Sequence, residues 1–276
     1  MLHKSKCNKA SCYQIRVKSL FLDYDGTISP LNASRSHSQV PAKTRTVLQR
    51  ISKFIPIIIV STKDLSFLLP RTPFAHAWGG IAGIEKKIGN TIKEHFLLET
   101  ALERIALGLQ YAKPNAKDAD LFVEEKQDSH GQTVAFCLDW RQASDTGAAK
   151  SKADMIASFC KKLDLEVIEY PGRPFYDVYP VVVDKGKAVR EIRKELKLED
   201  AALCMGDSEV DNSAFTACDV SLGVIREDNS WKNLVCDYFV KSREVADFLT
   251  LLLANDLVFD SGFPMVKTNP YRMGED

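Results

Sequence analysis

The chain has 276 residues, of which 45% are hydrophobic and 27% are charged. This length and composition suit one large or two modest folded domains and exclude a disordered chain. The 37 basic and 37 acidic side chains cancel, so no global charge draws the protein to nucleic acid or to an anionic membrane.

The cysteines and the N-terminal segment bear on the cellular location of the protein. The seven cysteines are scattered, odd in number and include no Cys-x-x-Cys pair, a pattern typical of a reduced intracellular protein. Residues 1–14 are a basic extension with no apolar segment behind it, so we expect a solvated extension and not a targeting signal. The sequence contains no run of about 18 apolar residues, which is the length needed to span a bilayer. We therefore expect a cytoplasmic monomer or weak oligomer that binds neither nucleic acid nor membrane.

The first part of the chain has the pattern of a β-α-β unit. Apolar residues 19–22 predict a buried strand that ends in the acidic segment 23–27, and the β-branched run 57–60 predicts a second buried strand. Between them a helix is expected behind Pro41. Its apolar positions are Val47, Leu48, Ile51 and Phe54.

The middle of the chain changes to an α+β pattern. An apolar helical stripe, ended by the segment 113–115, is formed by Leu98, Leu102, Ile105 and Leu109. Residues 133–140 alternate as in a strand with one buried face. A second helix and a short strand at 165–168 follow. The apolar positions of that helix are Met155, Ile156, Phe159 and Leu163.

The last part returns to strands that alternate with helices. Strands are predicted at 181–183, 201–205, 220–224 and 238–240, and residues 269–276 are expected to form a loose tail. A helix after the first of these strands has Ala188, Ile192 and Leu196 on one face.

These patterns predict an α/β fold with a discontinuous core and an insertion. Residues 1–97 and 179–276 are expected to form a core with a mainly parallel sheet, and residues 98–178 an inserted α+β domain.

Two acidic loops follow two of the predicted buried strands. Asp23 and Asp25 stand in the first loop, and Asp207 and Asp211 in the second. Ligands of open α/β sheets bind beyond the carboxyl ends of the strands, where both loops must lie. Carboxylates at such close spacing need a cation to compensate their charge. Together they predict an oxygen-rich site suited to Mg²⁺.

A hydroxyl and a lysine follow two further predicted strands. Ser61 comes directly after the strand at 57–60, and Lys185 after the one at 181–183. Lysine neutralises phosphate as a point charge. Each residue alone has an ordinary structural explanation, but together with the carboxylates they describe a phosphoryl-transfer site.

The ordered set of these residues resembles the four motifs of the haloacid dehalogenase superfamily. The motifs are Asp23-Tyr24-Asp25-Gly26-Thr27, Ser61, Lys185 and Gly206-Asp207-Ser208 with Asp211. The resemblance implies a Rossmann-like core with a C2-type cap, in which Asp23 is the nucleophile and Asp25 the general acid and base. It also implies that Thr27 orients the acid and that Ser61 and Lys185 hold the phosphoryl oxygens. Mg²⁺ would be bound by Asp23, the Asp25 carbonyl and Asp207.

Further strings are similar to those of trehalose-phosphatase-type members. They include Gly80 to Glu85, Phe122 to Lys126, Asp139-Trp140-Arg141, Gly172-Arg173 and Asp177 to Pro180. The family's cap uses a Glu-x-Lys segment on sugar hydroxyls, which falls on Glu124 and Lys126. Through the other strings the resemblance implies that Arg141, Arg173 and Asp177 also bind substrate.

Several strings depart from the family pattern, which leaves the sugar open. The family's Ser-Gly-Arg is Ser61-Thr62-Lys63 here, and its His-Tyr-Arg is Asp139-Trp140-Arg141. Trehalose 6-phosphate is the first candidate substrate, and another phosphate such as mannosyl-3-phosphoglycerate or sucrose phosphate is the second. A non-catalytic sugar-phosphate binding protein and a mutase or phosphotransferase remain alternatives.

Overall fold

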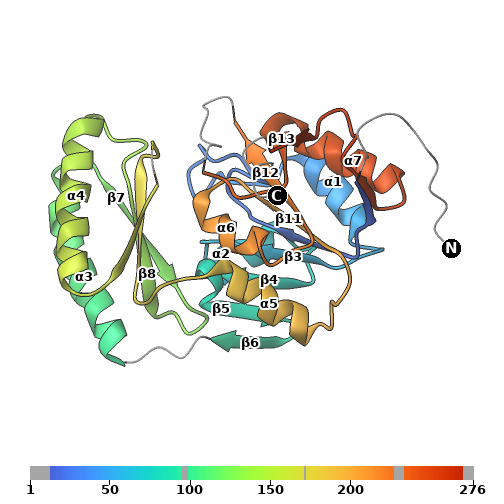
Figure 1. The fold of residues 1–276 in the computed structure, drawn as a ribbon. Helices are drawn as coiled ribbons and strands as arrows, with labels where there is room; N and C mark the ends of the chain where they lie inside the picture. Colours follow the sequence, from blue (N-terminus) through green and yellow to red (C-terminus); the bar gives the residue numbers. More distant parts are fainter. Residues whose placement is uncertain (1–12, 95–98, 171, 227–232, 270–276) are drawn as a thin grey trace, which may run out of the picture.

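The computed structural model describes residues 13–94, 99–170, 172–226 and 233–269. They form two units that lie side by side (Figure 1). The larger unit, here called the core, contains a nine-stranded sheet. The smaller unit, here called the insert, contains a four-stranded sheet. Within the described residues, no helix is both long and apolar enough to cross a membrane.

The core sheet has the order β15-β13-β12-β11-β2-β3-β4-β5-β6 and is parallel from β13 to β4. The edge strands β15, β5 and β6 are antiparallel to their neighbours. The strands are β2 (Ser19–Leu22), β3 (Ile57–Val60), β4 (Ala77–Gly80), β5 (Glu85–Ile88), β6 (Thr91–Glu94), β11 (Ala202–Gly206), β12 (Val220–Ile225), β13 (Tyr238–Lys241) and β15 (Lys267–Thr268). This arrangement confirms the predicted α/β fold class with a mainly parallel sheet.

Helices cover both faces of the core sheet (Figure 1). Leu48 of α1 and Phe248 of α7 belong to one apolar cluster with Leu22 and Ile57 of the sheet. On the other face, α5 and α6 pack against Phe21 and its neighbours. The helices are α1 (Ala42–Ile51), α2 (Leu65–Arg71), α5 (Lys185–Glu195), α6 (Asn212–Phe215) and α7 (Val245–Ala254), with short 3₁₀ turns η1 (Ile81–Gly83), η2 (Glu209–Asp211) and η3 (Ser242–Glu244).

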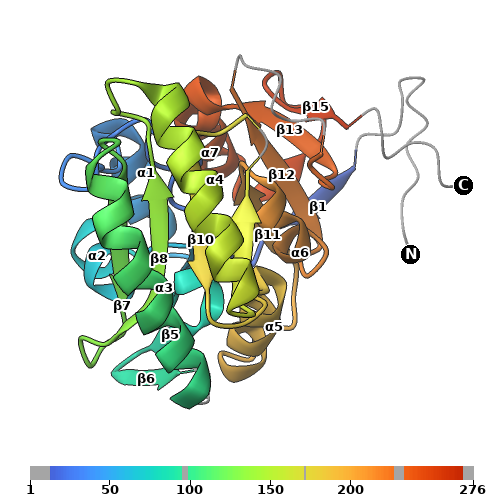
Figure 2. The ribbon, with the colours of Figure 1, turned by 90° about the vertical axis from the view of Figure 1, so that its left-hand side faces the viewer.

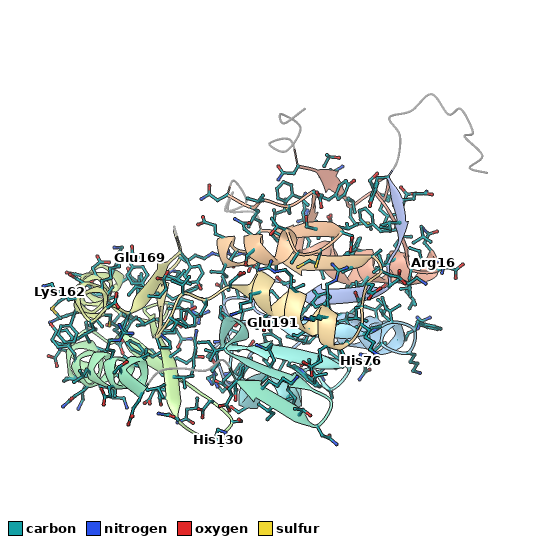
Figure 3. All side chains as sticks on the ribbon, turned by 60° about the horizontal axis from the view of Figure 1, so that its bottom comes forward. Arg16, His76, His130, Lys162, Glu169 and Glu191 are labelled. Carbon is teal, nitrogen blue, oxygen red and sulfur yellow. The ribbon has the colours of Figure 1, made fainter. Side chains whose placement is uncertain are left out.

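The insert is an antiparallel sheet of order β7-β8-β10-β9 with two helices on its outer face (Figure 2). Its elements are α3 (Glu99–Lys117), β7 (Phe122–Gln127), β8 (Thr133–Asp139), α4 (Thr146–Lys162), β9 (Glu166–Glu169) and β10 (Phe175–Tyr179). Lys162 and Glu169 lie at its outer end, whereas His130 at the β7–β8 turn comes close to the core, 3.2 Å from Glu94 (Figure 3). The exact division into residues 1–97, 98–178 and 179–276 stays a prediction.

The strand predicted at 181–183 was wrong. The segment connects β10 to α5 without being a strand, and Val182 is 78% exposed. Val181 to Val183 have the β-branched composition of a strand but no neighbour in either sheet. Lys185 therefore stands at the start of a helix and not at the end of a strand.

Other predictions about the insert were wrong in detail. The helix α3 does not end at 113–115 but continues through Pro114 to Lys117, because the buried Ala112 and Ala116 keep its last turn packed in the insert's apolar cluster. Both faces of β8 are buried, since one packs on the helices and the other faces the core. Leu98 lies outside the described residues.

The expectations for the ends of the chain need correction too. Gln14, placed in the solvated extension, pairs with Asp260 as β1 (Gln14–Arg16) joins β14 (Val258–Asp260). Asn269, placed in the loose tail, is buried and donates its amide to the carbonyls of Leu234 and Cys236. Phe54 lies beyond the end of α1 and is 70% exposed.

Candidate active site

The two acidic loops meet because their strands are neighbours. β2 and β11 are parallel and pair Leu22 with Met205, so the loops that follow them leave the same edge of the sheet. Asp23 N–H donates to the Met205 carbonyl at 2.9 Å. Within the described part of the chain, carboxylate oxygens of Asp23, Asp207 and Asp211 lie within 4.8 Å of one another, and all three residues are buried. The predicted cluster of acids therefore exists, with the Asp25 side chain outside it.

Lys185 supplies the charge that opposes this cluster. Its ammonium Nζ lies 2.8 Å from Oδ1 of Asp23 and 2.7 Å from Oδ1 of Asp211, and its side chain is 2% exposed. Burial disfavours its charge, but Asp211 and Asp23 outweigh burial and raise the pKa of Lys185. The lysine therefore stays charged and holds two loops together.

One lysine is not enough for three carboxylates. Burial raises the pKa of Asp23 well above its usual value, despite the attraction of Lys185. Burial also raises the pKa of Asp207 to about 6, despite the attraction of Arg173. A further cation would stabilise the ionised form of carboxylates whose pKa is raised in this way. The cluster thus fits a hard divalent ion such as Mg²⁺, by its excess negative charge and its all-oxygen donors.

Asp211 also has a structural part. Its Oδ2 accepts hydrogen bonds from the backbone N–H groups of Asp207 and Ser208, at 3.1 and 3.0 Å, and from the Ser208 hydroxyl at 3.0 Å. With Lys185 on its other oxygen, this carboxylate orders the second acidic loop. Its predicted part as a metal ligand stays a prediction.

Asp25, Thr27 and Ser61 surround the cluster in different ways. The Asp25 carboxylate is 3.7 Å from the ammonium of Lys63 and 3.4 Å from the Ser38 hydroxyl. Thr27 contacts Asp23, through a long hydrogen bond of 3.4 Å, and not the acid that it was expected to orient. Ser61 is fully buried behind the site, whereas Thr62 and Lys63 line the cavity itself.

Gly26 brings the first loop up against Asp207. Its φ is +78°, and a Cβ at this position would lie 2.1 Å from Oδ2 of Asp207. We expect Gly26→Ala to cost roughly 1–3 kcal/mol of stability through strain and to displace the Asp207 carboxylate. Urea unfolding measures the first effect. The Mg²⁺ dependence of the melting temperature measures the second.

Gly131→Ala is the matched control for this substitution. Gly131 has a φ of +80°, and no heavy atom of the described residues lies within 4 Å of a Cβ there. It carries the same backbone strain without the clash. Equal effects of Mg²⁺ on the two variants would contradict the proposed contact.

The insert meets the site through Glu124. This carboxylate, 4% exposed, lies 2.9 Å from Nζ of Lys63 and 2.6 Å from Nη1 of Arg35, both from the core. Burial would raise the pKa of Glu124, but Lys63, Lys126 and Arg35 together lower it to about 2. Neither Lys63 nor Arg35 was predicted as a site residue. The string Ser61-Thr62-Lys63, where the family has arginine, could have indicated Lys63, but no local pattern indicates Arg35.

A second buried network lies next to Glu124 in the insert. Lys126 donates to Oδ1 of Asp177 at 2.5 Å, and the hydroxyls of Tyr170 and Tyr179 donate to Oδ2 of Asp177 at 2.8 and 3.2 Å. Lys126 is 1% exposed. The predicted residues Glu124, Lys126 and Asp177 thus lie together on the face of the insert that looks toward the core.

Two arginines of the insert reach across to the core. Arg141 pairs with Asp139 and donates to the Leu31 carbonyl. Arg173 lies 3.2 Å from Oδ2 of Asp207 and donates to the Asp207 carbonyl at 3.0 Å. All five residues predicted to bind substrate therefore line one cavity with Asp23, Asp25, Lys185 and Asp207, and its volume is about 50 Å³.

The pKa of Glu124 makes the stability of the protein depend on pH in a defined window. The value is lowered from 4.5 to about 2, so ionised Glu124 stabilises the fold above pH 4.5, and this stabilisation is lost as the pH falls toward 2. We expect Glu124→Gln to be less stable than the parent by about 3 kcal/mol at pH 7. The difference should shrink between pH 4.5 and 2 in urea unfolding.

Glu125→Gln provides the control for this pH dependence. Glu125 is the next residue of β7 but pairs with Lys113, and its side chain is 32% exposed. Its substitution should cost less than about 1 kcal/mol. If the stability of both variants relative to the parent changed with pH in the same way, the buried charge of Glu124 would not be the cause of the pH dependence.

Comparisons with known proteins find relatives of low identity and solved structures of the same fold. No protein-family model matches the chain. It is 24% identical over 215 residues to "Probable trehalose-phosphate phosphatase C" of Arabidopsis thaliana, which covers 71% of this chain and 63% of that protein. It is 26% identical over 215 residues to "Probable trehalose-phosphate phosphatase D" of the same plant, over 71% of this chain and 55% of that protein. The chain spans 25% of a trehalose-phosphate synthase of Dictyostelium discoideum, at 24% identity over 73% of its own length.

Solved structures share the fold. The C-terminal domain of a trehalose-6-phosphate phosphatase of C. albicans matches with a TM-score of 0.70 and 19% identity, over 87% of this chain and 92% of that one. A trehalose-6-phosphate phosphatase related protein matches with a TM-score of 0.65 and 17% identity, over 86% and 98%. The predicted resemblance to these phosphatases is thus confirmed for the fold, while the chain spans only a quarter to two thirds of its curated relatives.

Proposed function

We propose that this chain, which has the fold of the haloacid dehalogenase-type phosphatases, is a Mg²⁺-dependent phosphatase of a sugar phosphate, with trehalose 6-phosphate as the first candidate. The observation that carries the proposal is the buried Asp23 carboxylate, which is held by Lys185 beside Asp207 and lines a cavity with both of them. The names of the relatives support trehalose phosphate as the sugar ester.

The metal would be held by Asp23, Asp207 and the Asp25 carbonyl, with Asp211 beside them. Bound Mg²⁺ would mask the negative charge of the phosphoryl group and of the carboxylates. The rest of the chemistry belongs to side chains of the chain itself.

In the proposed reaction, an oxygen of Asp23 forms a bond to phosphorus while the bond from phosphorus to the sugar oxygen breaks. Asp25 gives its proton to that leaving oxygen, and the sugar departs as an alcohol. Asp25, now ionised, takes a proton from water, whose oxygen attacks phosphorus and releases inorganic phosphate and free Asp23. Lys185, with its charge buried beside Asp23, stabilises the negative charge that develops during these steps.

We assign the insert, residues 98–178, as a cap over the core formed by 1–97 and 179–276. Support comes from Glu124, Arg141 and Arg173, which all extend from the insert to core residues around the cavity. A closed cap excludes bulk water from the phosphoryl group and strengthens the electrostatic contacts there.

Phosphate release under Mg²⁺ tests the proposal. We expect the parent to release phosphate from p-nitrophenyl phosphate and from trehalose 6-phosphate with Mg²⁺, and to lose at least about 100-fold in rate with excess chelator. Activity should return when Mg²⁺ is restored. Trehalose 6-phosphate binding without turnover would favour a binding protein, and a phosphorylated sugar acceptor without free phosphate would favour a phosphotransferase.

A further inference from the structure

The string at residues 80–85 takes no part in the proposed reaction, yet it is bonded to a loop of the site. The N–H of Ile81 donates to the Lys63 carbonyl and the N–H of Ala82 to the Ser61 carbonyl, both at 2.8 Å. Ile81 and Ala82 have left-handed φ values of +50° and +54°. Backbone in this conformation persists only where the surrounding structure imposes it. The string is therefore a constrained support for the loop that carries Lys63.

Glu85, at the end of this string, links the core to the insert. Its side chain is buried, and its Oε1 accepts a hydrogen bond of 2.6 Å from the backbone N–H of Ser129, in the turn between β7 and β8. Its Oε2 is buried without a hydrogen-bond partner among the described residues. Burial accordingly raises the pKa of Glu85 above its usual value. An apolar side chain would cost less free energy at this place, so what the carboxylate adds is the bond to the insert.

An apolar contact between the two units lies beside this bond. Ile84, which precedes Glu85, belongs to one buried cluster with Val134 and Ala135 of β8 and Tyr179 of β10. The strand β8 begins directly after the turn that contains Ser129. The units are thus packed together here, and the Glu85 bond gives that packing a defined register.

These contacts form a closed ring that includes the active site. Ser129 follows β7, whose buried residues Glu124 and Lys126 line the cavity of Asp23. Glu124 is bonded to Lys63 at 2.9 Å, and the Lys63 carbonyl is bonded back to the string that ends in Glu85. A paired strand moves as a unit, so a shift of the turn would displace both residues of β7 in the cavity.

We propose that Glu85 is a positioning residue, whose bond to the Ser129 N–H sets the place of Glu124 and Lys126 in the cavity. The inference rests on the proposed phosphatase function. Glu85 does not line the cavity itself, so it acts through the insert and not on the substrate. A change at this bond should weaken the binding of a sugar phosphate while the transfer of the phosphoryl group stays intact.

Ser129→Pro removes the N–H of this bond and leaves Glu85 in place. The Gly131 N–H donates to the Asp128 carbonyl at 3.1 Å, so Ser129 is the second residue of a tight turn, a position that proline favours. We expect kcat/KM for trehalose 6-phosphate to fall at least about tenfold through KM. The value for p-nitrophenyl phosphate, which has no sugar, should change less than about twofold.

Ser129→Ala is the matched control, because it keeps the N–H and loses only the hydroxyl bond to Glu94. Both esters should stay within about twofold of the parent. Equal losses for the two esters in Ser129→Pro, or a loss as large in Ser129→Ala, would overturn the inference.

Two substitutions of Glu85 separate the bond from the shape of the side chain. Glu85→Ala should reproduce the effects of Ser129→Pro and serves the same tests if that variant does not fold. The amide oxygen of Glu85→Gln can accept the same N–H, so this variant should stay within about threefold of the parent for trehalose 6-phosphate. A glutamine variant as impaired as the alanine variant would overturn the role of the hydrogen bond.

A double-mutant cycle in urea unfolding tests the same link without a substrate. Glu85 and Glu124 share no hydrogen-bond partner among the described residues, so independent sites would give additive shifts of the midpoint. If Glu85 positions Glu124, the shift caused by Glu124→Gln should be smaller by at least about a third in the Glu85→Ala background. Glu125→Gln, at the neighbouring residue that pairs with Lys113, should give the same shift in both backgrounds.

The cycle keeps the two proposals apart. Additive shifts would overturn the positioning role of Glu85 and leave the phosphatase function standing. A parent that releases no phosphate from either ester would overturn the phosphatase function, and the cycle would still decide whether Glu85 positions Glu124.

Discussion

Asp23→Asn should lower phosphate release from p-nitrophenyl phosphate and from sugar phosphates at least about 1,000-fold. An amide is a poor nucleophile, and no other described carboxylate combines the place of Asp23 beside Lys185 with access to the cavity. The substitution should change the free energy of unfolding by less than about 1 kcal/mol, since burial already disfavours the Asp23 charge and Lys185 keeps Asp211 as a partner. Phosphate release and urea unfolding together separate lost chemistry from lost fold.

Asp25→Asn gives a sharper companion to this variant. Without a base to activate water, the phosphoryl group should remain on Asp23, and intact-protein mass spectrometry should detect one added phosphoryl group after incubation with p-nitrophenyl phosphate. Asp23→Asn should show no such adduct. Asp247→Asn, at an exposed position paired with Lys43, is the control and should retain full activity. An adduct in Asp23→Asn would place the nucleophile elsewhere.

Lys185→Met should cost about 3–5 kcal/mol of stability, the largest effect expected from a single substitution in the site. The change leaves the carboxylates of Asp23 and Asp211 buried without the cation that joins them. Activity should fall as well, because Lys185 also stabilises the charge of the reaction. The measurement is urea unfolding at pH 7, with the slope of the transition checked against the parent.

A double-mutant cycle tests the cause of that loss. The Asp23→Asn background lacks one of the two buried carboxylates that lose their cation when Lys185 is replaced. Lys185→Met should therefore lower the free energy of unfolding by at least about 1 kcal/mol less in that background. Lys194→Met, nine residues further along α5 and exposed, should be nearly neutral. Additive costs in the cycle would show that packing and not charge explains the role of Lys185.

The buried parallel strands of the core were predictable from the sequence, whereas its edge was not. β2 and β3 are short apolar runs covered on both faces, and such runs have few alternatives. β5 and β6, with the sequences EKKI and TIKE, carry charges because they lie at the antiparallel edge. Their composition does not differ from that of a loop. The run at 181–183 shows the converse, an apolar segment that joins no sheet.

The site was predictable where one loop carries its own motif, and not where the partners come from distant elements. Each of the acidic loops, after β2 and after β11, contains all the residues of its own motif. The contact of Glu124 with Lys63 and Arg35 joins residues 61 and 89 positions apart, and only the packing of the insert on the core creates it. The same packing explains why Arg173 faces Asp207.

The pairing of β2 with β11 also bears on when the site can form during synthesis. Asp23 is made before Lys185, the bond between them spans 162 positions, and the insert is made in between. Long-range pairing of this kind slows folding, because the intervening chain must be ordered or looped out first. The insert, whose strands pair locally, can order while the core still lacks its central neighbour strand. The first acidic loop therefore stays without its cation until Lys185, 162 positions after Asp23, has been made.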